Sequence, residues 1–443
     1  MRFYLDQRGC AKNQVDGEEI GARLEASGHA WAPSADEADL IIVNSCGFIE
    51  DAKKESLDAV LDWKARYPGK RVLLAGCLAQ RYAADLAEGL PEADGIVGNA
   101  DLAAVVAAAE ETAAGGRPVR VPEAAPSIGA FRRGRLLDFP GTAHVKITEG
   151  CSNGCSYCAI PLIRGSLKSR PVEEVAAECR DLVARGIREL VLVGQDLGAY
   201  GRELSGGELL PPLLSALSAT PGDFRVRTLY IHPDNFPYAI LPIIKADPRL
   251  LPYFDLPFQH ASAPVLRAMN RKGSPEAYLR LLSRIREALP DAVIRSTFLL
   301  GFPGETDEDF AALRGFQEAA RIDWLGAFAY SREEGTAAYA MKGRVPKKTV
   351  AERKKAVEEA QERITSERLA RFVGRELEVL VEEPVEGAAE DRDGGEELSL
   401  GRAWLQAPEV DGLTVLRGRF EAGTAVRAKV LAVNGVDLDA RPL

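Results

Sequence analysis

The chain has 443 residues, of which 46% are hydrophobic, and its formal net charge is −10 at pH 7. This length is too great for one compact core, so we expect two or three domains in a globular chain. The acidic balance argues against a protein that coats nucleic acid over its whole surface, although it leaves a local basic patch open.

The N-terminus, MRFYLDQRGC, is charged where a signal peptide would be apolar, and no stretch of about 18 uncharged apolar residues occurs further on. We therefore expect a cytoplasmic protein that does not contact a membrane. Thiols are kept reduced in the cytoplasm, so metal binding or catalysis explains the seven cysteines of the chain better than disulfides do.

Three short β-type runs at the start of the chain each end in a cysteine, and helical patterns separate them. The cysteines are Cys10, Cys46 and Cys77, which we call the N-terminal triad. Strand–helix–strand alternation predicts a doubly wound parallel α/β domain, which we place at residues 1–115. Because the carboxyl ends of parallel strands converge, we expect the three cysteines to meet and to hold an iron–sulfur cluster. The alternative is three small buried residues at strand ends.

A linker is predicted after an Ala-rich helical stretch at 102–114. The segment GGRPVRVPEAAPSIGAFRRGR is rich in Pro and Gly, as connecting segments are. We place the linker at 116–135 and a second domain at 136–372. The basic RRGR within the linker is interpreted as a solvated connector rather than as a binding patch.

The second domain opens with three cysteines in the stretch EGCSNGCSYC. Cys151, Cys155 and Cys158, which we call the loop triad, follow the pattern C-x3-C-x2-C. A structural zinc site or an ordinary [4Fe–4S] site uses four ligands. Three thiolates would hold three irons of a cubane and leave the fourth iron open to the amine and carboxylate of S-adenosylmethionine. An electron from the cluster would then break a C–S bond and give a 5′-deoxyadenosyl radical. A zinc knuckle or an adventitious Cys-rich loop is the alternative.

Six β-type runs separated by helical segments predict a partial (β/α)6 barrel related to the TIM barrel. Each run ends in polar or Gly-rich residues, and the carboxyl ends of barrel strands are where such folds carry their chemistry. Each polar residue could instead end a strand or support a neighbour. The candidates at this rim are Glu149, Gln195, Asp196, His232, Gln259, His260, Arg295 and Glu305.

The seventh cysteine, Cys179, falls within the helical pattern VEEVAAECRDLVARG. It shares an apolar face with Val172, Val175 and Leu182, a spacing typical of core packing. We therefore interpret Cys179 as a structural residue and not as a ligand.

A long charged helix and a β-rich module end the chain. The pattern KKTVAERKKAVEEAQERITSERLARFVG predicts a helix that stops at Gly374. Four short β runs with Gly-containing turns follow, so residues 374–443 are predicted to form a small β-barrel. From Arg375 onward this module has 15 Asp and Glu against 8 Lys and Arg, a balance that would repel phosphate and attract a basic protein. The alternative is a solvated acidic insertion, since EEPVEGAAEDRDGGEE supplies much of the charge.

The loop triad, with the aromatic Tyr157 before its last cysteine, resembles the radical-SAM superfamily. Two cysteine triads, six β/α repeats and a terminal barrel together resemble the radical-SAM methylthiotransferases over essentially the whole chain. The resemblance implies two [4Fe–4S] clusters, an auxiliary one on the N-terminal triad and one for S-adenosylmethionine on the loop triad. The terminal module is similar to a TRAM domain, which engages the macromolecular substrate in that family.

Two subgroups of that family compete. One modifies isopentenylated adenosine in tRNA, and the other an aspartate of protein twelve of the small ribosomal subunit. Around the second cysteine the tRNA subgroup reads close to N-T-C-A-x-R-E, whereas this chain reads NSCGFIEDAKKESL. KITEGCSNGCSYCAIPLIRGSLKSRP and APEVDG also fit the ribosomal-protein subgroup better, so the chain is most similar to that subgroup. The tRNA enzyme is the nearest alternative, and a non-enzymatic iron–sulfur carrier is a more distant one.

The resemblance implies that two S-adenosylmethionine molecules are used per turnover. One methylates sulfur at the auxiliary cluster, and the other yields the radical that takes hydrogen from the aspartate β-carbon, where no side-chain base would suffice. Implied partners are free protein twelve or the assembled small subunit, a reductant such as flavodoxin or ferredoxin, and a sulfur donor. No catalytic side chain is expected beyond the clusters. We expect Tyr157 beside the adenine, Gln195 near the methionyl end and Arg295 on its carboxylate.

Overall fold

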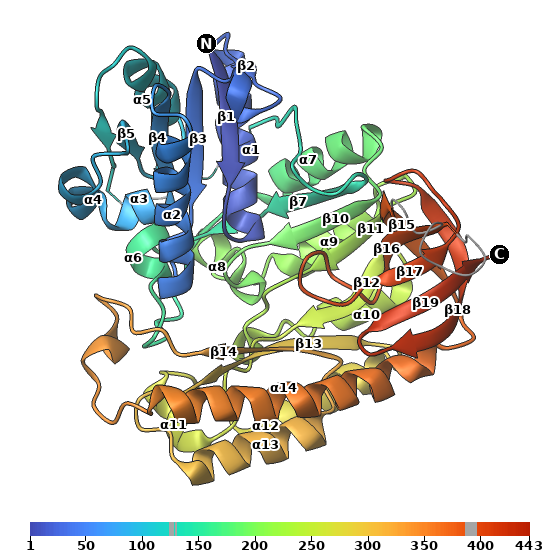
Figure 1. Ribbon diagram of the computed structural model, residues 1–443. Coiled ribbons are helices and arrows are strands. Elements are labelled where there is room, and N and C mark those ends of the chain that lie inside the picture. The colour runs from blue at the N-terminus through green and yellow to red at the C-terminus, as the bar shows by residue number, and fades with distance from the viewer. Residues whose placement is uncertain (124–127, 129–130, 386–396) are drawn as a thin grey trace.

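The computed structural model describes residues 1–123, 128, 131–385 and 397–443. Part of the expected linker and most of EEPVEGAAEDRDGGEE lie outside the described residues, so the interpretation of that acidic segment stays a prediction. The chain forms an N-terminal α/β unit, a central open β/α barrel and a closed β-barrel module (Figure 1). This arrangement confirms the predicted fold class.

The N-terminal unit is a parallel sheet of six strands, in the order β2-β1-β3-β4-β5-β6. Alternate residues of the buried third strand face opposite cores, Leu40 and Ile42 on one side and Ile41 and Val43 on the other. Helices cover both faces, so the sheet is doubly wound, as predicted. The elements are β1 (Arg2–Gln7), α1 (Ala11–Ala26), β2 (Ala30–Trp31), β3 (Leu40–Ser45), α2 (Glu50–Arg66), β4 (Arg71–Gly76), α3 (Cys77–Arg81), α4 (Ala83–Gly89), β5 (Gly95–Val97), α5 (Ala104–Ala113) and β6 (Val119–Arg120).

The segment interpreted as a linker is partly built into the folded units. β6 lies within 116–135 and pairs in parallel with β5, so the first sheet continues past residue 115. The interpretation of RRGR as a solvated connector is wrong for Arg133, which is buried and ion-paired with Glu18 of α1 and Glu178 of the central unit. A buried guanidinium needs such carboxylates, and neither lies near it in the sequence.

The central unit is an open parallel sheet in the order β14-β13-β12-β11-β10-β7, with helices packed on its outer face. Cys179 is fully buried in this outer core, as predicted. The elements are β7 (Thr142–Lys146), β8 (Thr148–Glu149), α6 (Ile160–Arg164), β9 (Lys168–Ser169), α7 (Val172–Ala184), β10 (Glu189–Val193), α8 (Arg202–Ser205), α9 (Leu210–Ser218), β11 (Arg225–Thr228), α10 (Ile240–Ala246), β12 (Leu250–Asp255), α11 (Ala263–Ala268), α12 (Pro275–Ala288), β13 (Val293–Leu300), α13 (Asp307–Ala320), β14 (Trp324–Ala329) and α14 (Lys347–Leu369).

The last helix and the terminal module differ from the prediction at their ends. α14 stops at Leu369 rather than at Gly374, and a 3-10 turn follows that buries Phe372 against the module. The module closes with a fifth strand beyond the four expected, in the order β15-β16-β17-β19-β18. Charged residues interrupt that last strand, while Leu438 and Ala440 point into the cores. The strands are β15 (Glu376–Pro384), β16 (Leu398–Ala403), β17 (Thr414–Arg417), β18 (Ala425–Asn434) and β19 (Asp437–Pro442).

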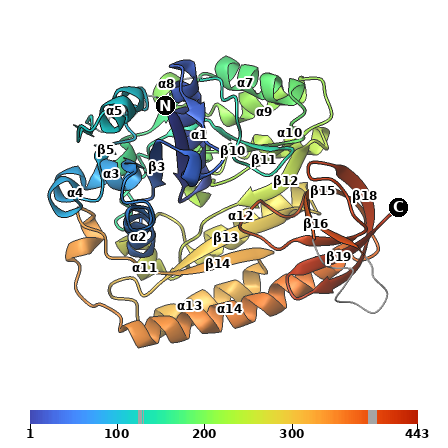
Figure 2. The same cartoon turned by 45° about the horizontal axis from the view of Figure 1, so that its top comes forward.

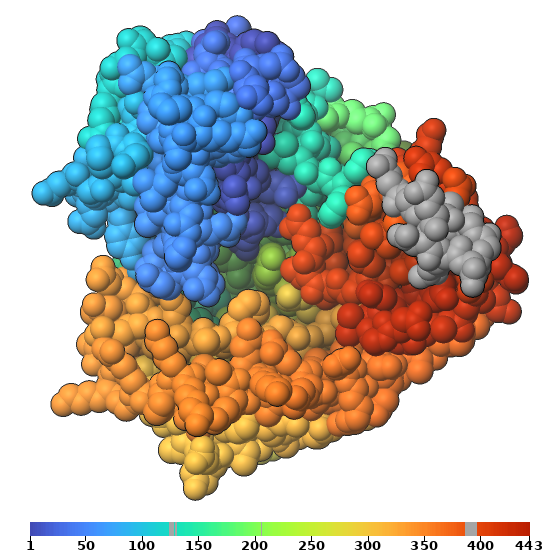
Figure 3. Space-filling view, in the orientation of Figure 1, coloured from blue at the N-terminus to red at the C-terminus, as the bar shows by residue number. Residues whose placement is uncertain are grey.

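The N-terminal unit and the β-barrel module both pack on the central sheet (Figure 2). The space-filling view shows a hollow between them (Figure 3). α1 contacts β7 on one side. On the other, Leu405 of the module joins Val191, Tyr253 and Trp324 of the central strands in one apolar core. None of the helices in the described part of the chain is both long and apolar enough to span a membrane.

Candidate active site

The cysteines of the N-terminal triad follow neighbouring strands of the first sheet. Cys10 stands between β1 and α1, Cys46 follows β3, and Cys77 begins α3 directly after β4. β1, β3 and β4 are adjacent and parallel, so their carboxyl ends bring the three cysteines to the same edge. Cys77 is buried and Cys10 is exposed, which leaves the triad open on one side.

Two glycines let the three cysteine loops approach one another. Gly9 has a φ of +86°, and a Cβ at this position would stand 2.9 Å from the Cβ of Cys46. A Cβ on Gly47 would stand 2.8 Å from the carbonyl carbon of Cys77. Any larger residue at either position would therefore push the cysteine loops apart.

The surroundings of the N-terminal triad affect its three thiols unequally. Burial raises the pKa of Cys77 to about 12, and the Arg164 guanidinium opposes this rise. Burial also raises the pKa of Cys46. For Cys10, desolvation by the surrounding protein is outweighed by the charges of Lys12 and Arg164, so its pKa is lowered. Cys10 is thus the thiol of this triad that ionises most readily.

The loop triad lies between β8 and α6, on a loop fixed by contacts of its own. Gly150 has a φ of +67°, and a Cβ there would stand 2.1 Å from a carbonyl oxygen of the segment after α6. Ser156 Oγ donates to the carbonyl of Ala268 (2.7 Å), and Asn270 Nδ2 donates to the carbonyl of Gly154 (2.8 Å). The loop is therefore held in shape independently of anything the cysteines bind.

Burial and a neighbouring thiol oppose the ionisation of two thiols of the loop triad. Burial raises the pKa of Cys151 to about 11 and that of Cys158 to about 12, and the Cys155 thiol adds to both rises. A bound cation would reverse this penalty, because it stabilises thiolates over thiols.

The donor set of each triad fits a [4Fe–4S] cubane. All six cysteines are free of disulfides. Among the described residues, no three His, Cys, Asp or Glu side chains are placed to hold a single metal ion. In a cubane each thiolate binds a different iron, so the sulfurs stand farther apart than the ligands of one ion do. In each triad, three free thiols supply one thiolate for each of three irons.

Four charged side chains lie buried between the two triads, and we call them the junction cluster: Asp16, Lys146, Glu149 and Arg164. Arg164 Nη1 donates to both carboxylate oxygens of Glu149 (3.0 Å each), and its Nη2 donates to Asp16 (2.8 Å). Lys146 Nζ donates to Glu149 (2.7 Å) and also to Asp16. Burial opposes ionisation of Glu149, but Arg164 and Lys146 outweigh it and lower the pKa to about 2. The network sets two carboxylates against two cationic groups, so its formal charges cancel.

Arg164 also reaches the N-terminal triad. Its Nη2 lies 3.2 Å from the Sγ of Cys77, a sulfur that accepts a second hydrogen bond from Asn99 Nδ2 (3.3 Å). Glu149 is two residues before Cys151, so the junction cluster connects both triads through one ion-pair network. The sequence pattern predicted Glu149 as a site residue, but it did not predict that Lys146 and Arg164 pair with it. The available signal is Lys146, a charge inside the otherwise buried run AHVKIT, which requires a buried partner.

Two of the residues expected to contact the cofactor lie beside the loop triad. Tyr157 is half-buried, and its hydroxyl oxygen accepts a hydrogen bond from Arg271 Nη1 (3.1 Å). Gln195 follows β10 and donates through Nε2 to Glu149 (3.3 Å). The Oε1 atom of Gln195 is buried and has no hydrogen-bond partner within the described residues. Gln195 thus offers an acceptor next to the loop triad.

Arg295, the third residue expected to contact the cofactor, lies on β13 and pairs with carboxylates of the chain itself. Its guanidinium pairs with Asp255 (3.1 Å) and with Asp411 of the β-barrel module (3.4 Å). Asp411 also accepts hydrogen bonds from the Tyr253 hydroxyl (2.5 Å) and the Ala407 backbone N–H (2.8 Å). The expected contact between Arg295 and a cofactor carboxylate stays a prediction.

Of the remaining rim candidates, Asp196 is the one joined to the cysteine loop. Its carboxylate accepts from Asn153 Nδ2 (2.8 Å), which lies between the first two cysteines of the loop triad, and from Asn235 Nδ2 (2.6 Å). The backbone N–H of His232 donates to the same carboxylate (2.9 Å). Burial lowers the pKa of His232 to about 3, so the ring is neutral at physiological pH.

The last three candidates are engaged in structural contacts. Gln259 has a φ of +67° and bridges to Phe298 of β13. Glu305 pairs with Arg353 of α14 (2.6 Å), and the buried His260 ring lies 3.7 Å from Glu305. These contacts tie the ends of β12 and β13 to α14.

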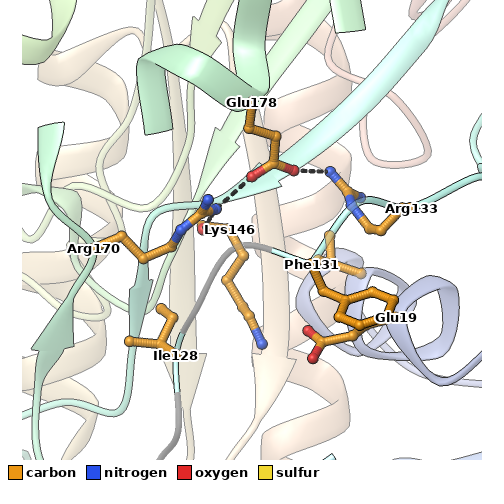
Figure 4. A pocket seen from close by; sticks show the side chains of 8 residues that line it. Glu19, Ile128, Phe131, Arg133, Lys146, Arg170 and Glu178 are labelled. Carbon is orange, nitrogen blue, oxygen red and sulfur yellow. Dashed lines mark hydrogen bonds and ion pairs between the residues drawn. The ribbon is translucent and has the colours of Figure 1, made fainter. Parts of the chain in front are cut away.

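A small cavity lies beside Lys146 (Figure 4). Glu178 accepts hydrogen bonds there from Arg133 (2.6 Å) and from Arg170 (2.5 Å). The free volume of about 20 Å³ suits a water molecule and is too small for a cofactor. The lining residues are Val15, Glu19, Ile128, Phe131, Arg133, Lys146, Arg170 and Glu178.

Comparisons with known families divide the chain as its fold does. Residues 2–98 match a family described as uncharacterized protein family UPF0004, residues 145–316 match the radical SAM superfamily, and residues 373–443 match the TRAM domain. Among solved structures, the radical S-adenosylmethionine methyltransferase TsrM from Kitasatospora setae superposes with a TM-score of 0.56 at 15% identity, covering 76% of this chain and 74% of TsrM. This likeness confirms the fold of the radical-SAM core.

Relatives named ribosomal protein uS12 methylthiotransferase RimO match over almost the whole chain. The relative from Treponema denticola is 46% identical and covers 98% of this chain and 99% of its own length. The relative from Thermotoga maritima is 38% identical, with 96% and 95% covered. Identity at this level across all three units shows common descent of the complete architecture. The chain therefore belongs to the RimO family of ribosomal protein uS12 methylthiotransferases.

Proposed function

We propose that this chain is a radical-SAM enzyme that places a methylthio group on the β-carbon of an aspartate of ribosomal protein uS12 and uses two S-adenosylmethionine molecules per turnover. The observation that carries the proposal is the placement of two separate cysteine triads on either side of one buried ion-pair network. A single-cluster radical enzyme needs only the loop triad. Transfer of a sulfur group needs a second place where sulfur is held, and the N-terminal triad supplies three thiols for it.

The six triad cysteines would hold the two clusters. When bound, these clusters supply the electron that cleaves S-adenosylmethionine and the position at which sulfur is held before transfer. Cys10 is the exposed member of its triad, so a substrate would reach the sulfur held there from this open side. Gln195 and Tyr157 lie next to the loop triad, where they would bind S-adenosylmethionine, and the buried Oε1 of Gln195 would accept from its amine.

Identity to the RimO relatives supports protein uS12 as the substrate in place of tRNA. The described parts of the β-barrel module, 375–385 and 397–443, hold 10 Asp and Glu against 7 Lys and Arg. This net negative charge agrees with a basic protein as the partner. We propose further that the enzyme works in the cytoplasm on free uS12 or on the assembled small subunit. It would take electrons from a flavodoxin- or ferredoxin-type reductant and sulfur from a separate donor.

Mass spectrometry of a strain that lacks this protein tests the substrate. We expect uS12 from the deletion strain to lose the mass of an SCH3-for-H exchange, and the loss to be reversed by the wild-type chain but not by a Cys155→Ala chain. Digested tRNA should keep its methylthio nucleosides. Loss of those nucleosides with unchanged uS12 would assign the chain to the tRNA reaction instead.

A further inference from the structure

Arg164 contacts the N-terminal triad directly and contacts Glu149, the residue that leads into the loop triad. It lies at the end of α6 with 4% of its surface exposed, and its partners come from three different segments of the chain. One edge of the guanidinium holds Glu149, which leads into the loop triad. The other edge holds Asp16 at 2.8 Å and the Sγ of Cys77 at 3.2 Å.

A charged N–H donor to a cysteine sulfur has a known effect on an iron–sulfur cluster. Hydrogen bonds to the sulfurs and the net charge nearby are among the factors that set the reduction potential. The reduced cluster carries one more negative charge than the oxidised one, so a positive donor stabilises the reduced form and raises the potential. An effect through an outer contact of this kind is ordinary for metal sites.

The structure also provides a charge of opposite sign at the same sulfur. Asp16 accepts a hydrogen bond from the same Nη2 atom of Arg164 that lies against the Cys77 sulfur, so its negative charge opposes that of Arg164 at this sulfur. Removal of Asp16 would therefore leave Arg164 less neutralised and the sulfur in a more positive field. Removal of Arg164 would do the reverse. A residue that merely supports the fold would give no such pair of opposite effects.

We propose that Arg164 is a positioning residue that links the two triads and raises the reduction potential of the cluster held by Cys10, Cys46 and Cys77, with Asp16 as its opposing partner. The inference rests on the proposed function, because it requires a cluster on the N-terminal triad. Its consequence is that the electron affinity of the sulfur-holding site is set by a residue of the radical-SAM core and not by the N-terminal unit alone.

The test measures the reduction potential of the auxiliary cluster in a full-length chain. The three cysteines of the loop triad are replaced by alanine, so that the remaining cluster is the auxiliary one, and its potential is followed by EPR during an anaerobic redox titration. Arg164→Gln is expected to shift the potential negatively, by about 59 mV if the reduced-to-oxidised ratio at a fixed potential falls about tenfold. Asp16→Asn is expected to shift it positively.

Arg170→Gln is the matched control. Arg170 is a buried arginine of the same neighbourhood that donates to Glu174, Glu178 and the Lys146 carbonyl, and within the described residues it donates to no cysteine (Figure 4). We expect its replacement to leave the potential unchanged. Equal shifts of the same sign in the Arg164, Asp16 and Arg170 variants would assign the effect to loosened packing and overturn the proposal, as would no shift in the Arg164 variant.

Two further measurements keep the outcomes separable. Iron and sulfide are counted in the parent before any potential is read, and a parent without a cluster would refute the proposed function itself rather than the role of Arg164. Should Arg164→Gln fail to fold, Asp16→Asn decides: a positive shift supports the proposal, and no shift or a negative one overturns it. Arg164→Lys keeps the positive charge but loses the planar guanidinium that binds Glu149, Asp16 and Cys77 together. We expect it to shift the potential less than Arg164→Gln does.

Discussion

Glycine at position 150 is as necessary to the loop triad as the cysteines that follow it. Its positive φ turns the chain from β8 into the cysteine loop, and its missing side chain leaves room for the carbonyl oxygen of Ser166. Gly28, at the end of α1, also has a positive φ, +84°, but an added Cβ there would meet no atom within 4 Å. A comparison of substitutions at the two glycines therefore separates the energetic cost of a positive φ from the cost of a steric clash.

Gly150→Ala is expected to destabilise the protein more than Gly28→Ala does. Both changes carry the backbone cost of a positive φ, on the order of 1–3 kcal/mol. Only Gly150→Ala also forces a Cβ against a carbonyl oxygen, so we expect it to reduce iron bound to the loop triad as well. Urea unfolding and iron analysis of both variants measure this. Equal stabilities and full iron content in both would show that the close approach at Gly150 does not shape the loop.

Single residues differ in how far the sequence alone reveals them. The N-terminal triad could be predicted because each cysteine ends a β-type run and parallel strands share an edge. Arg164 could not, because its partners Asp16, Glu149 and Cys77 are brought to it by three separate elements. A sequence shows that a buried charge needs partners, but only the packed fold shows which ones they are.

The segment between β16 and β17 is the element that fastens the β-barrel module to the central sheet. Asp411 of this segment contacts Tyr253 and Arg295, and Trp324 Nε1 donates to the Leu405 carbonyl (2.8 Å). Burial raises the pKa of Asp411 to about 6, and the nearby Arg295 only partly opposes the rise. The segment is therefore an attachment whose strength depends on pH.

The sign of this dependence follows from proton binding. Between pH 4 and pH 6, the folded protein keeps a proton on Asp411 that the unfolded chain has released, so rising pH destabilises the fold. A shift of about two pKa units corresponds to about 3 kcal/mol at most. We expect the stability of the wild type relative to Asp411→Asn to fall from pH 4 to pH 6 in thermal unfolding. Asp223→Asn, at a side chain that is 83% exposed, is the control. Parallel curves for Asp411→Asn and wild type would contradict the assignment.

Buried ion pairs between the units hold the whole molecule together. The N-terminal unit joins the core through Asp16 and Arg164, and the β-barrel module joins it through Glu189 and Arg402 (3.0 Å). Glu189 is fully buried and also binds Arg225 (2.8 Å). Buried, desolvated ion pairs thus connect each of the outer units to the central one.

Glu189→Gln is expected to lower the free energy of unfolding by about 3–5 kcal/mol, because it leaves buried guanidinium groups without their carboxylate. Glu376→Gln removes an exposed pair with Arg427 and is expected to cost no more than about 1 kcal/mol. Urea unfolding followed by tryptophan fluorescence compares the two. A similar small loss in both variants would mean that the core and the module do not depend on this contact.

At the scale of the whole molecule, the sequence predicts the three folded units better than it predicts the contacts between them. The six central strands fall in β-type runs of strand length between helical patterns, so the pattern of the sequence predicts them. The last strand, Asp437–Pro442, escapes prediction because charges interrupt it and closure of the barrel supplies its partners. The end of α14 is displaced because Phe372 packs into the contact with the module.

The central claim is that the chain holds two cubanes, each on three thiolates. Mössbauer spectroscopy and iron analysis of anaerobically reconstituted protein test it most directly. We predict about eight irons per chain in two [4Fe–4S] clusters for the wild type, about four in Cys46→Ala and in Cys155→Ala, and about eight in Cys179→Ala. Only Cys155→Ala among these should abolish release of 5′-deoxyadenosine from S-adenosylmethionine. About eight irons retained in Cys46→Ala, or a wild type with zinc or one cluster, would contradict the account.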